Sequence, residues 1–143
     1  MVQVGKITEN YKQYVNALDT LKEALELELE HSESAKLSRA LKDTAIQRFD
    51  YTYEILWKLL KNIAEYEKLE SKSPRETFKN AFRLRFILEE DEQTFLDMIT
   101  NRNLTSHTYN EDISLGIFNF IANNGIKAFD LIQKRLGDYL TEL

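Results

Sequence analysis

Residues that interrupt helices are scarce in this sequence. It contains four Gly and one Pro in 143 residues, whereas average usage would give roughly ten and seven. Leu, Glu, Lys and Ala, which favour helices, are frequent. No stretch of alternating polarity indicates a β-strand, and there is no internal repeat or low-complexity tract. The sequence therefore predicts an all-α fold.

Apolar residues recur at intervals of three and four in six segments, as in amphipathic helices. The first two run from about Thr8 to Glu30 and from about Ser38 to Leu69. The third begins at Ser73-Pro74, and the fourth begins after Glu89–Glu92 and should end near Asn101 or Arg102. The fifth begins after Asn110, and we expect Asn123-Asn124-Gly125 to interrupt it before the sixth begins. Short loops predict an up-and-down antiparallel four-helix bundle with one or two additional helices, as a single domain over residues 1–143.

Two of these starts carry recognisable caps. Ser73 can cap the third helix, with Pro74 at its first position and Glu76 completing a capping box. Asn110 is a good cap for the fifth helix, which has two acidic residues in its first turn.

Composition limits the partners and the compartment. The net charge is −5, whereas general affinity for nucleic acid needs a basic surface, so any RNA contact must be local or assisted by a partner. Without cysteine there is no disulfide, thiolate metal site or thiol nucleophile. No targeting segment and no run of about 20 apolar residues is visible. We expect a cytoplasmic protein that does not enter the membrane.

Motif searches leave one short pattern. No GxGxxG, phosphate-binding loop or HExxH motif is found. His31 and His107 are the only histidines, so a multi-histidine metal site within one chain is excluded, and no metal or cofactor is expected. What remains is Arg102-x4-His107-x-Tyr109.

Three stretches resemble the HEPN superfamily, and most closely its nucleotidyltransferase substrate-binding proteins, which include HepT-like toxins. Residues 46–58 resemble the aromatic second-helix signature, and Ser73-Pro74 with Ala81-Phe82 resembles the start of the third helix. Residues 101–110 match the signature loop. The resemblance spans roughly residues 46–110, and the two ends match only in helical pattern.

The resemblance implies a homodimer that works with a separately encoded minimal nucleotidyltransferase. Many such pairs are toxin–antitoxin systems in which the helical protein is a metal-independent ribonuclease. In some, the partner adenylylates the motif tyrosine, here Tyr109. Others are described only as the nucleotide- or substrate-binding half of a transferase. Our leading hypothesis is the ribonuclease toxin, and the alternative is a non-catalytic subunit that binds nucleotide or substrate; a bundle that uses the loop only to dimerise is a third reading.

The motif suits metal-independent cleavage of single-stranded RNA. Histidine exchanges protons near neutral pH, so His107 could deprotonate a 2′-hydroxyl or protonate a leaving oxygen. Arg102 could hold phosphate oxygens. In a continuous helix, residues five apart lie about 140° apart around the axis. Either residues 103–106 break the helix, with Asn103, Thr105 and Ser106 as breakers or caps, or the two side chains meet across a dimer, which would also supply two histidines. Asn103 and Ser106 are also candidate binding residues beside Tyr109.

The motif residues and several other residues also allow other interpretations. Arg102 could cap a helix, His107 could be a loop residue bonded to backbone, and Tyr109 could pack in the core. Trp57 and the nearby tyrosines could stack on bases, although helical spacing favours packing. Glu89–Glu92 could bind a hard cation or simply start a helix. Four cations at intervals of three and four form either a solvated face or a phosphate track: Lys72, Arg75, Lys79 and Arg83.

Overall fold

Helices account for most of the chain. The computed structural model describes residues 2–143 and contains no β-strand in that range. The α-helices are α1 (Val4–Glu30), α2 (Ala35–Tyr66), α3 (Pro74–Arg83), α4 (Glu92–Leu104), α5 (Glu111–Phe120) and α6 (Ile126–Thr141). Short 3-10 turns cover Glu89–Asp91 and Thr105–His107, and a π-helical turn covers Ile121–Gly125. The all-α prediction is confirmed.

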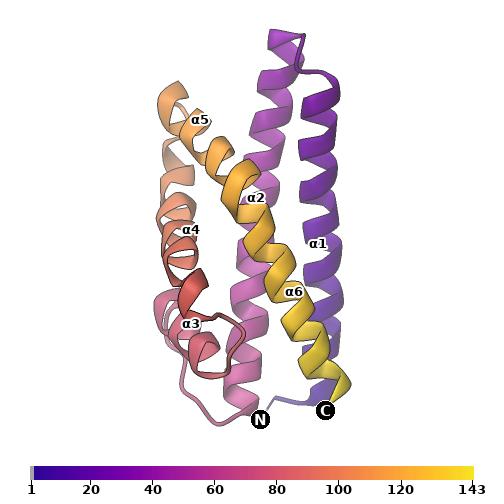
Figure 1. The fold of residues 1–143 in the computed structure, drawn as a ribbon, viewed down its shortest axis with the longest axis vertical. Coiled ribbons are helices and arrows are strands. Elements are labelled where there is room, and N and C mark those ends of the chain that lie inside the picture. The colour runs from indigo at the N-terminus through magenta and orange to yellow at the C-terminus, as the bar shows by residue number, and fades with distance from the viewer. Residues whose placement is uncertain (1) are drawn as a thin grey trace.

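The helices form a bundle built on one long hairpin (Figure 1). α1 and α2 run side by side along the length of the molecule. α3 and α4 lie along one side of α2, and the rod made of α5 and α6 crosses the front of the bundle obliquely. Both chain ends lie at the same end of the bundle.

The core contains the apolar stripes that the sequence predicts. Phe49 of α2 is fully buried, and its ring centroid lies 6.0 Å from that of Phe129 and 6.5 Å from that of Phe120. The buried Tyr14 hydroxyl donates a hydrogen bond to the Phe129 carbonyl at 2.6 Å. This bond satisfies the one polar atom that Tyr14 brings into the core.

α2 ends without a glycine. Lys68 lies two residues beyond its end at Tyr66 and has a φ of 63°, and Arg85 ends α3 in the same way with a φ of 66°. The N–H of Leu69 then donates to the Ala64 carbonyl at 2.7 Å, the pattern in which glycine is usual. α2 therefore ends three residues before the predicted Leu69.

The helix break predicted at Asn123-Asn124-Gly125 is wrong. The backbone of Gly125 is helical, with φ −61° and ψ −45°, and α5 continues through the π turn into α6. A Cβ at Gly125 would lie 3.3 Å from the Phe120 ring, so this glycine permits a close approach and does not end a helix. α4 reaches Leu104, two residues beyond the predicted end near Asn101 or Arg102.

The predicted caps at Ser73 and Asn110 are confirmed. The Ser73 hydroxyl accepts a hydrogen bond from the Glu76 N–H, and the Asn110 side chain accepts one from the Ile113 N–H, both at 3.1 Å. The Glu76 carboxylate accepts its return bond from the Lys72 N–H at 3.4 Å, not from the Ser73 N–H that the capping box requires.

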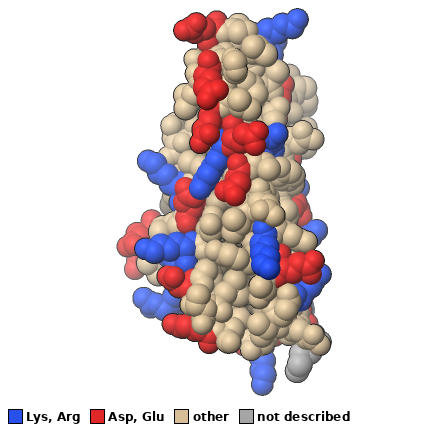
Figure 2. Space-filling model, turned by 90° about the vertical axis from the view of Figure 1, so that its right-hand side faces the viewer, with Lys and Arg blue, Asp and Glu red and all other residues tan. Residues whose placement is uncertain are grey.

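Charged side chains cover much of the outer surface. On the side of the bundle that carries α1, acidic side chains gather over the upper half (Figure 2). Within residues 2–143, every helix is too short or too polar to cross a membrane.

Candidate functional site

Residues 102–109, the motif loop, join α4 to α5 in largely helical backbone. The Thr105 hydroxyl donates to the Arg102 carbonyl at 2.7 Å, and the Ser106 hydroxyl donates to the Asn103 carbonyl at 3.3 Å. These short polar side chains thus bond back to carbonyls of the last turn of α4, a local contact that competes with continuation of the helix. The α-helix ends at Leu104 and the backbone continues as the 3-10 turn Thr105–His107, so α4 ends inside residues 103–106, as the first of the two alternatives expected.

Arg102 is held against α2. Its Nη2 donates to the Glu54 carboxylate at 3.2 Å, and its Nε lies 3.4 Å from Asp50 Oδ1. The guanidinium lies 5.8 Å from the centroid of the Tyr53 ring, and the Trp57 indole N–H donates to the other Glu54 oxygen at 3.0 Å. Arg102 thus fixes the end of α4 to α2, and a phosphate that binds Arg102 must compete with two carboxylates.

The aromatic stretch of α2 and the motif loop therefore form one cluster. Asp50, Tyr53, Glu54 and Trp57 follow the i, i+3, i+4, i+7 spacing of one helical face. Asp50 and Glu54 were not among the residues that the sequence pattern indicated as partners of Arg102. Their spacing was the available signal, but it does not say which helix that face contacts.

Burial governs the ionisation of this cluster. It raises the pKa of the Asp50 carboxyl above its ordinary value, although the Thr105 hydroxyl and Arg102 act in the opposite direction. It also raises the pKa of Tyr53 to about 12. Asp50 Oδ1 and Arg102 Nε are both buried, and neither has a hydrogen-bond partner in the part of the chain described. The pair is close but poorly aligned, so the ionised Asp50 is not fully compensated.

Asp50→Asn tests this conclusion through pH. Because the folded-state pKa of Asp50 is raised, its contribution to stability is present at low pH and is lost as the pH rises through that value. Relative to Asp50→Asn, the free energy of unfolding of the wild type should increase as the pH is lowered from 7 to about 4, near the ordinary aspartate pKa. Urea denaturation of both proteins at the two pH values measures the change. A change in the opposite direction would contradict the burial argument.

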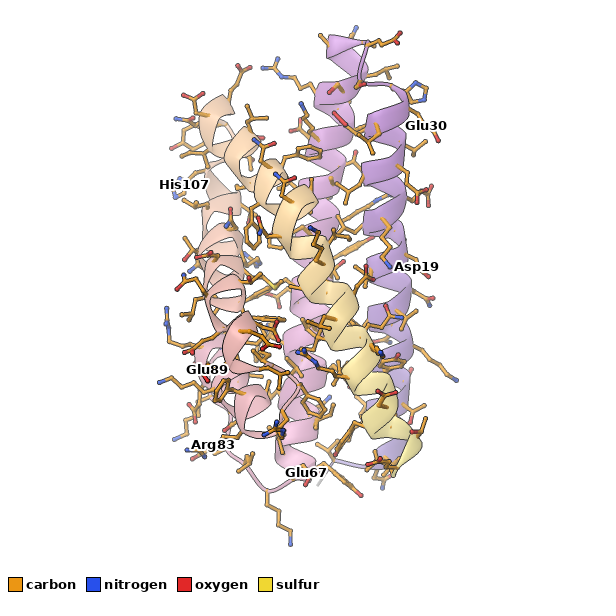
Figure 3. All side chains as sticks on the ribbon, viewed as in Figure 1. Asp19, Glu30, Glu67, Arg83, Glu89 and His107 are labelled. Atoms are coloured by element: carbon orange, nitrogen blue, oxygen red, sulfur yellow. The ribbon has the colours of Figure 1, made fainter. Side chains whose placement is uncertain are left out.

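His107 and Tyr109 form an exposed pair. The Tyr109 hydroxyl lies 3.5 Å from His107 Nδ1, with ring centroids 6.0 Å apart and planes at 71°. Tyr109 is 84% exposed, more than any other large apolar or aromatic side chain in residues 2–143. His107 is also exposed and points away from the bundle (Figure 3). Tyr109 is therefore not a core residue.

Arg102 and His107 point to different surroundings. Within residues 2–143 no hydrogen bond or ion pair joins them, because Arg102 turns toward α2 while His107 turns to Tyr109. Asn103 and Ser106 are exposed beside them. The structure thus brings His107 together with Tyr109, and Arg102 together with the acids of α2.

Two hollows flank Tyr109, each of about 480 Å³. One lies between the starts of α2 and α5, where Arg39 forms an ion pair with Glu111 and Lys42 lies nearby. The other lies between α2 and the motif loop and is lined by Asp43 and Asp50 among others. The Tyr109 phenol is therefore accessible from two sides.

Three of the four cations of the suggested phosphate track lie along a different surface. Arg75, Lys79 and Arg83 border a groove of about 300 Å³ between α3 and α4, the α3–α4 groove. Its lining is otherwise mostly apolar and includes Phe78, Phe82, Phe95 and Ile99. Lys72 lies before α3 and forms an ion pair with Glu70 at 3.3 Å.

No cluster of three or more His, Asp or Glu side chains suited to a metal ion occurs among the described residues, Glu89–Glu92 included. Trp57 is partly buried and packs against the core. These findings leave the motif loop as the candidate site.

Comparisons with known proteins identify the family of this chain. Residues 9–138 match the family model described as nucleotidyltransferase substrate binding protein like. A solved structure from Thermus thermophilus is 33% identical, with a TM-score of 0.72 over 86% of this chain and 98% of the other. The search of curated proteins gives no match. The chain belongs to the nucleotidyltransferase substrate-binding protein-like family.

Proposed function

We propose that this chain is a homodimeric, metal-independent endoribonuclease that works with a separately encoded minimal nucleotidyltransferase, as the toxin of a toxin–antitoxin pair. The family supports the association with a nucleotidyltransferase. The observation that carries the proposal is the contact between His107 and Tyr109 in an exposed loop. The contact brings an imidazole and a phenol together, and the proposal uses them as the acid–base group and the acceptor of a nucleotidyl group.

Cleavage would proceed through the RNA's own 2′-hydroxyl. His107 accepts the 2′-hydroxyl proton as the 2′-oxygen forms a bond to phosphorus, and the bond from phosphorus to the 5′-oxygen breaks. The 5′-oxygen leaves with a proton from a second acid, and the products are a 2′,3′-cyclic phosphate and a 5′-hydroxyl. An arginine beside the phosphorus stabilises the extra negative charge.

One chain provides a single histidine in the motif loop, so base and acid would come from two copies. A dimer that brings the two loops together contains two copies of His107 and two of Arg102. It would also allow Arg102 of one chain to stabilise the phosphate charge while His107 of the other chain transfers the proton. This arrangement agrees with the separation of the two side chains within one chain.

Modification of Tyr109 would control this centre. The Tyr109 hydroxyl attacks the α-phosphorus of ATP, an oxygen–phosphorus bond forms, and pyrophosphate leaves. The phenol proton passes to His107 Nδ1, 3.5 Å away. The bound adenylate would then lie beside His107 and hinder RNA from reaching it.

The acceptor is tested with the purified partner and ATP. We expect intact-mass spectra to show one added adenylate on the wild type and none on Tyr109→Phe, because phenylalanine has no nucleophilic oxygen. Tyr66→Phe is the matched control, since Tyr66 is also exposed, at 38%, and this variant should be modified like the wild type. Equal modification of Tyr109→Phe and the wild type would exclude Tyr109 as the acceptor.

A second function is favoured by the surroundings of Arg102. Its charge is balanced by Asp50 and Glu54, as suits a structural residue in a non-catalytic subunit that binds nucleotide or substrate for the transferase. Asn103, Ser106 and Tyr109 would then be contact residues. RNA cleavage in EDTA distinguishes the two functions, since only the ribonuclease cuts.

A further inference from the structure

We propose that the α3–α4 groove docks an acidic amphipathic helix of the nucleotidyltransferase, an inference that rests on the proposed association with that partner. A groove between two helices is a common binding place for a third, which lays its apolar face along the floor. The charges and the floor of this groove indicate the kind of helix that fits.

The groove has a row of cations without partners. Within residues 2–143, Arg75, Lys79 and Arg83 form no ion pair and no side-chain hydrogen bond, whereas Arg102 and Arg135 are paired with carboxylates. Glu92 is the only acidic residue in the groove lining. On a chain of net charge −5, this row is a local positive edge, so it complements an acidic partner.

The spacing of these cations matches a helix. They are four residues apart on α3, which places successive charges about 6 Å apart along the helix axis. Carboxylates at every fourth position of a helix lying along α3 would have the same spacing. Each could therefore face one cation.

The floor favours a protein helix over single-stranded RNA. Phe78 and Phe95 are buried, and only Phe82 among the aromatic residues of the groove is exposed, at 42%. Sequence-tolerant binding of single strands uses several exposed aromatic rings on which successive bases stack. One exposed ring beside aliphatic side chains instead suits the apolar face of a helix.

The groove is separate from the motif loop. The groove lies along α3 and the first two turns of α4, whereas the motif loop begins in the last turn of α4. This helix of 13 residues is about 20 Å long. Figure 3 shows Arg83 and His107 at different heights on the same side of the bundle. A partner docked in the groove could thus reach Tyr109 along α4 without covering it.

Calorimetric titration of the whole chain with the purified nucleotidyltransferase tests the groove. Lys79→Glu and Phe82→Ser should each raise Kd at least tenfold, because one places like charges together and the other removes an apolar contact. Lys12→Glu and Leu131→Ser are matched controls: Lys12 is an exposed cation of α1, and Leu131 is 37% exposed. Both should bind as the wild type does. Circular dichroism checks the fold, and Lys79→Glu tests the groove even if Phe82→Ser is unstable.

The outcomes separate this inference from the proposed function. If the wild type binds the transferase and both groove variants bind equally well, the groove inference is wrong and the association stands. If the wild type does not bind, the association itself fails, and the groove inference fails with it. If the groove variants lose affinity for a single-stranded RNA but not for the transferase, the groove is a phosphate track. If they change only the dimer mass in light scattering, a second copy occupies it.

Discussion

His107→Ala is expected to lower the rate of RNA cleavage about 10²- to 10⁴-fold, the usual contribution of a positioned acid–base group. The measurement is the cleavage rate of a single-stranded RNA in EDTA, with unmodified protein freed of its partner. The products should end in 2′,3′-cyclic phosphate, because the internal hydroxyl is the nucleophile.

His31→Ala is the matched control. His31 is the only other histidine and is an exposed residue of the α1–α2 turn, so this variant should cut as fast as the wild type. Both variants should keep their helical content, since neither imidazole is buried. Equal rates for His107→Ala and the wild type would remove His107 from the chemistry.

Arg102→Ala is expected to lower the same rate about 10²- to 10³-fold, the usual loss on removing a donor that stabilises transition-state charge. Arg102→Lys should recover little, because an ammonium group cannot reproduce the two-pronged contact of a guanidinium. The change also leaves Asp50 and Glu54 without their cation, so urea denaturation must show that each variant is folded under the assay conditions. If folded Arg102→Ala cleaves at the wild-type rate, Arg102 has no part in catalysis and only connects α4 to α2.

The sequence predicts the core well because one period repeats along each helix. Ala45, Phe49, Tyr53, Leu56 and Leu60 are all buried, as their spacing on α2 requires. Caps are also local, so Ser73 and Asn110 could be identified from neighbouring residues.

The helix ends were harder to predict, because the residues found there are not the types that usually end or continue a helix. Lys68 and Arg85 adopt the left-handed conformation that commonly marks glycine. Gly125 does the reverse: its backbone stays helical, and its lack of a side chain makes room for Phe120. The scarcity of glycine therefore predicts long helices correctly. It does not indicate where α2 and α3 end, because their ends contain no glycine.

The candidate site was identified from sequence only in part. The motif residues follow from their pattern and from the family resemblance, and their local spacing correctly implied that Arg102 and His107 do not converge in a continuous helix. The Asp50 and Glu54 contacts come from a helix about 50 residues earlier in the chain and require the packing of α2 against α4. The end of α4 falls within residues 103–106, as one of the expected alternatives has it, but the sequence did not indicate the 3-10 turn that follows and brings His107 close to Tyr109.

The ribonuclease and its control by Tyr109 can be tested together in one preparation. Cleavage of single-stranded RNA in EDTA is measured before and after nucleotidyl transfer to Tyr109, with the transferase removed each time. We expect cleavage before transfer and its loss afterwards, while Tyr109→Phe taken through the same steps keeps cutting. RNA left intact by the clean, unmodified dimer would contradict the ribonuclease proposal, and undiminished cleavage after complete modification would contradict the control by Tyr109.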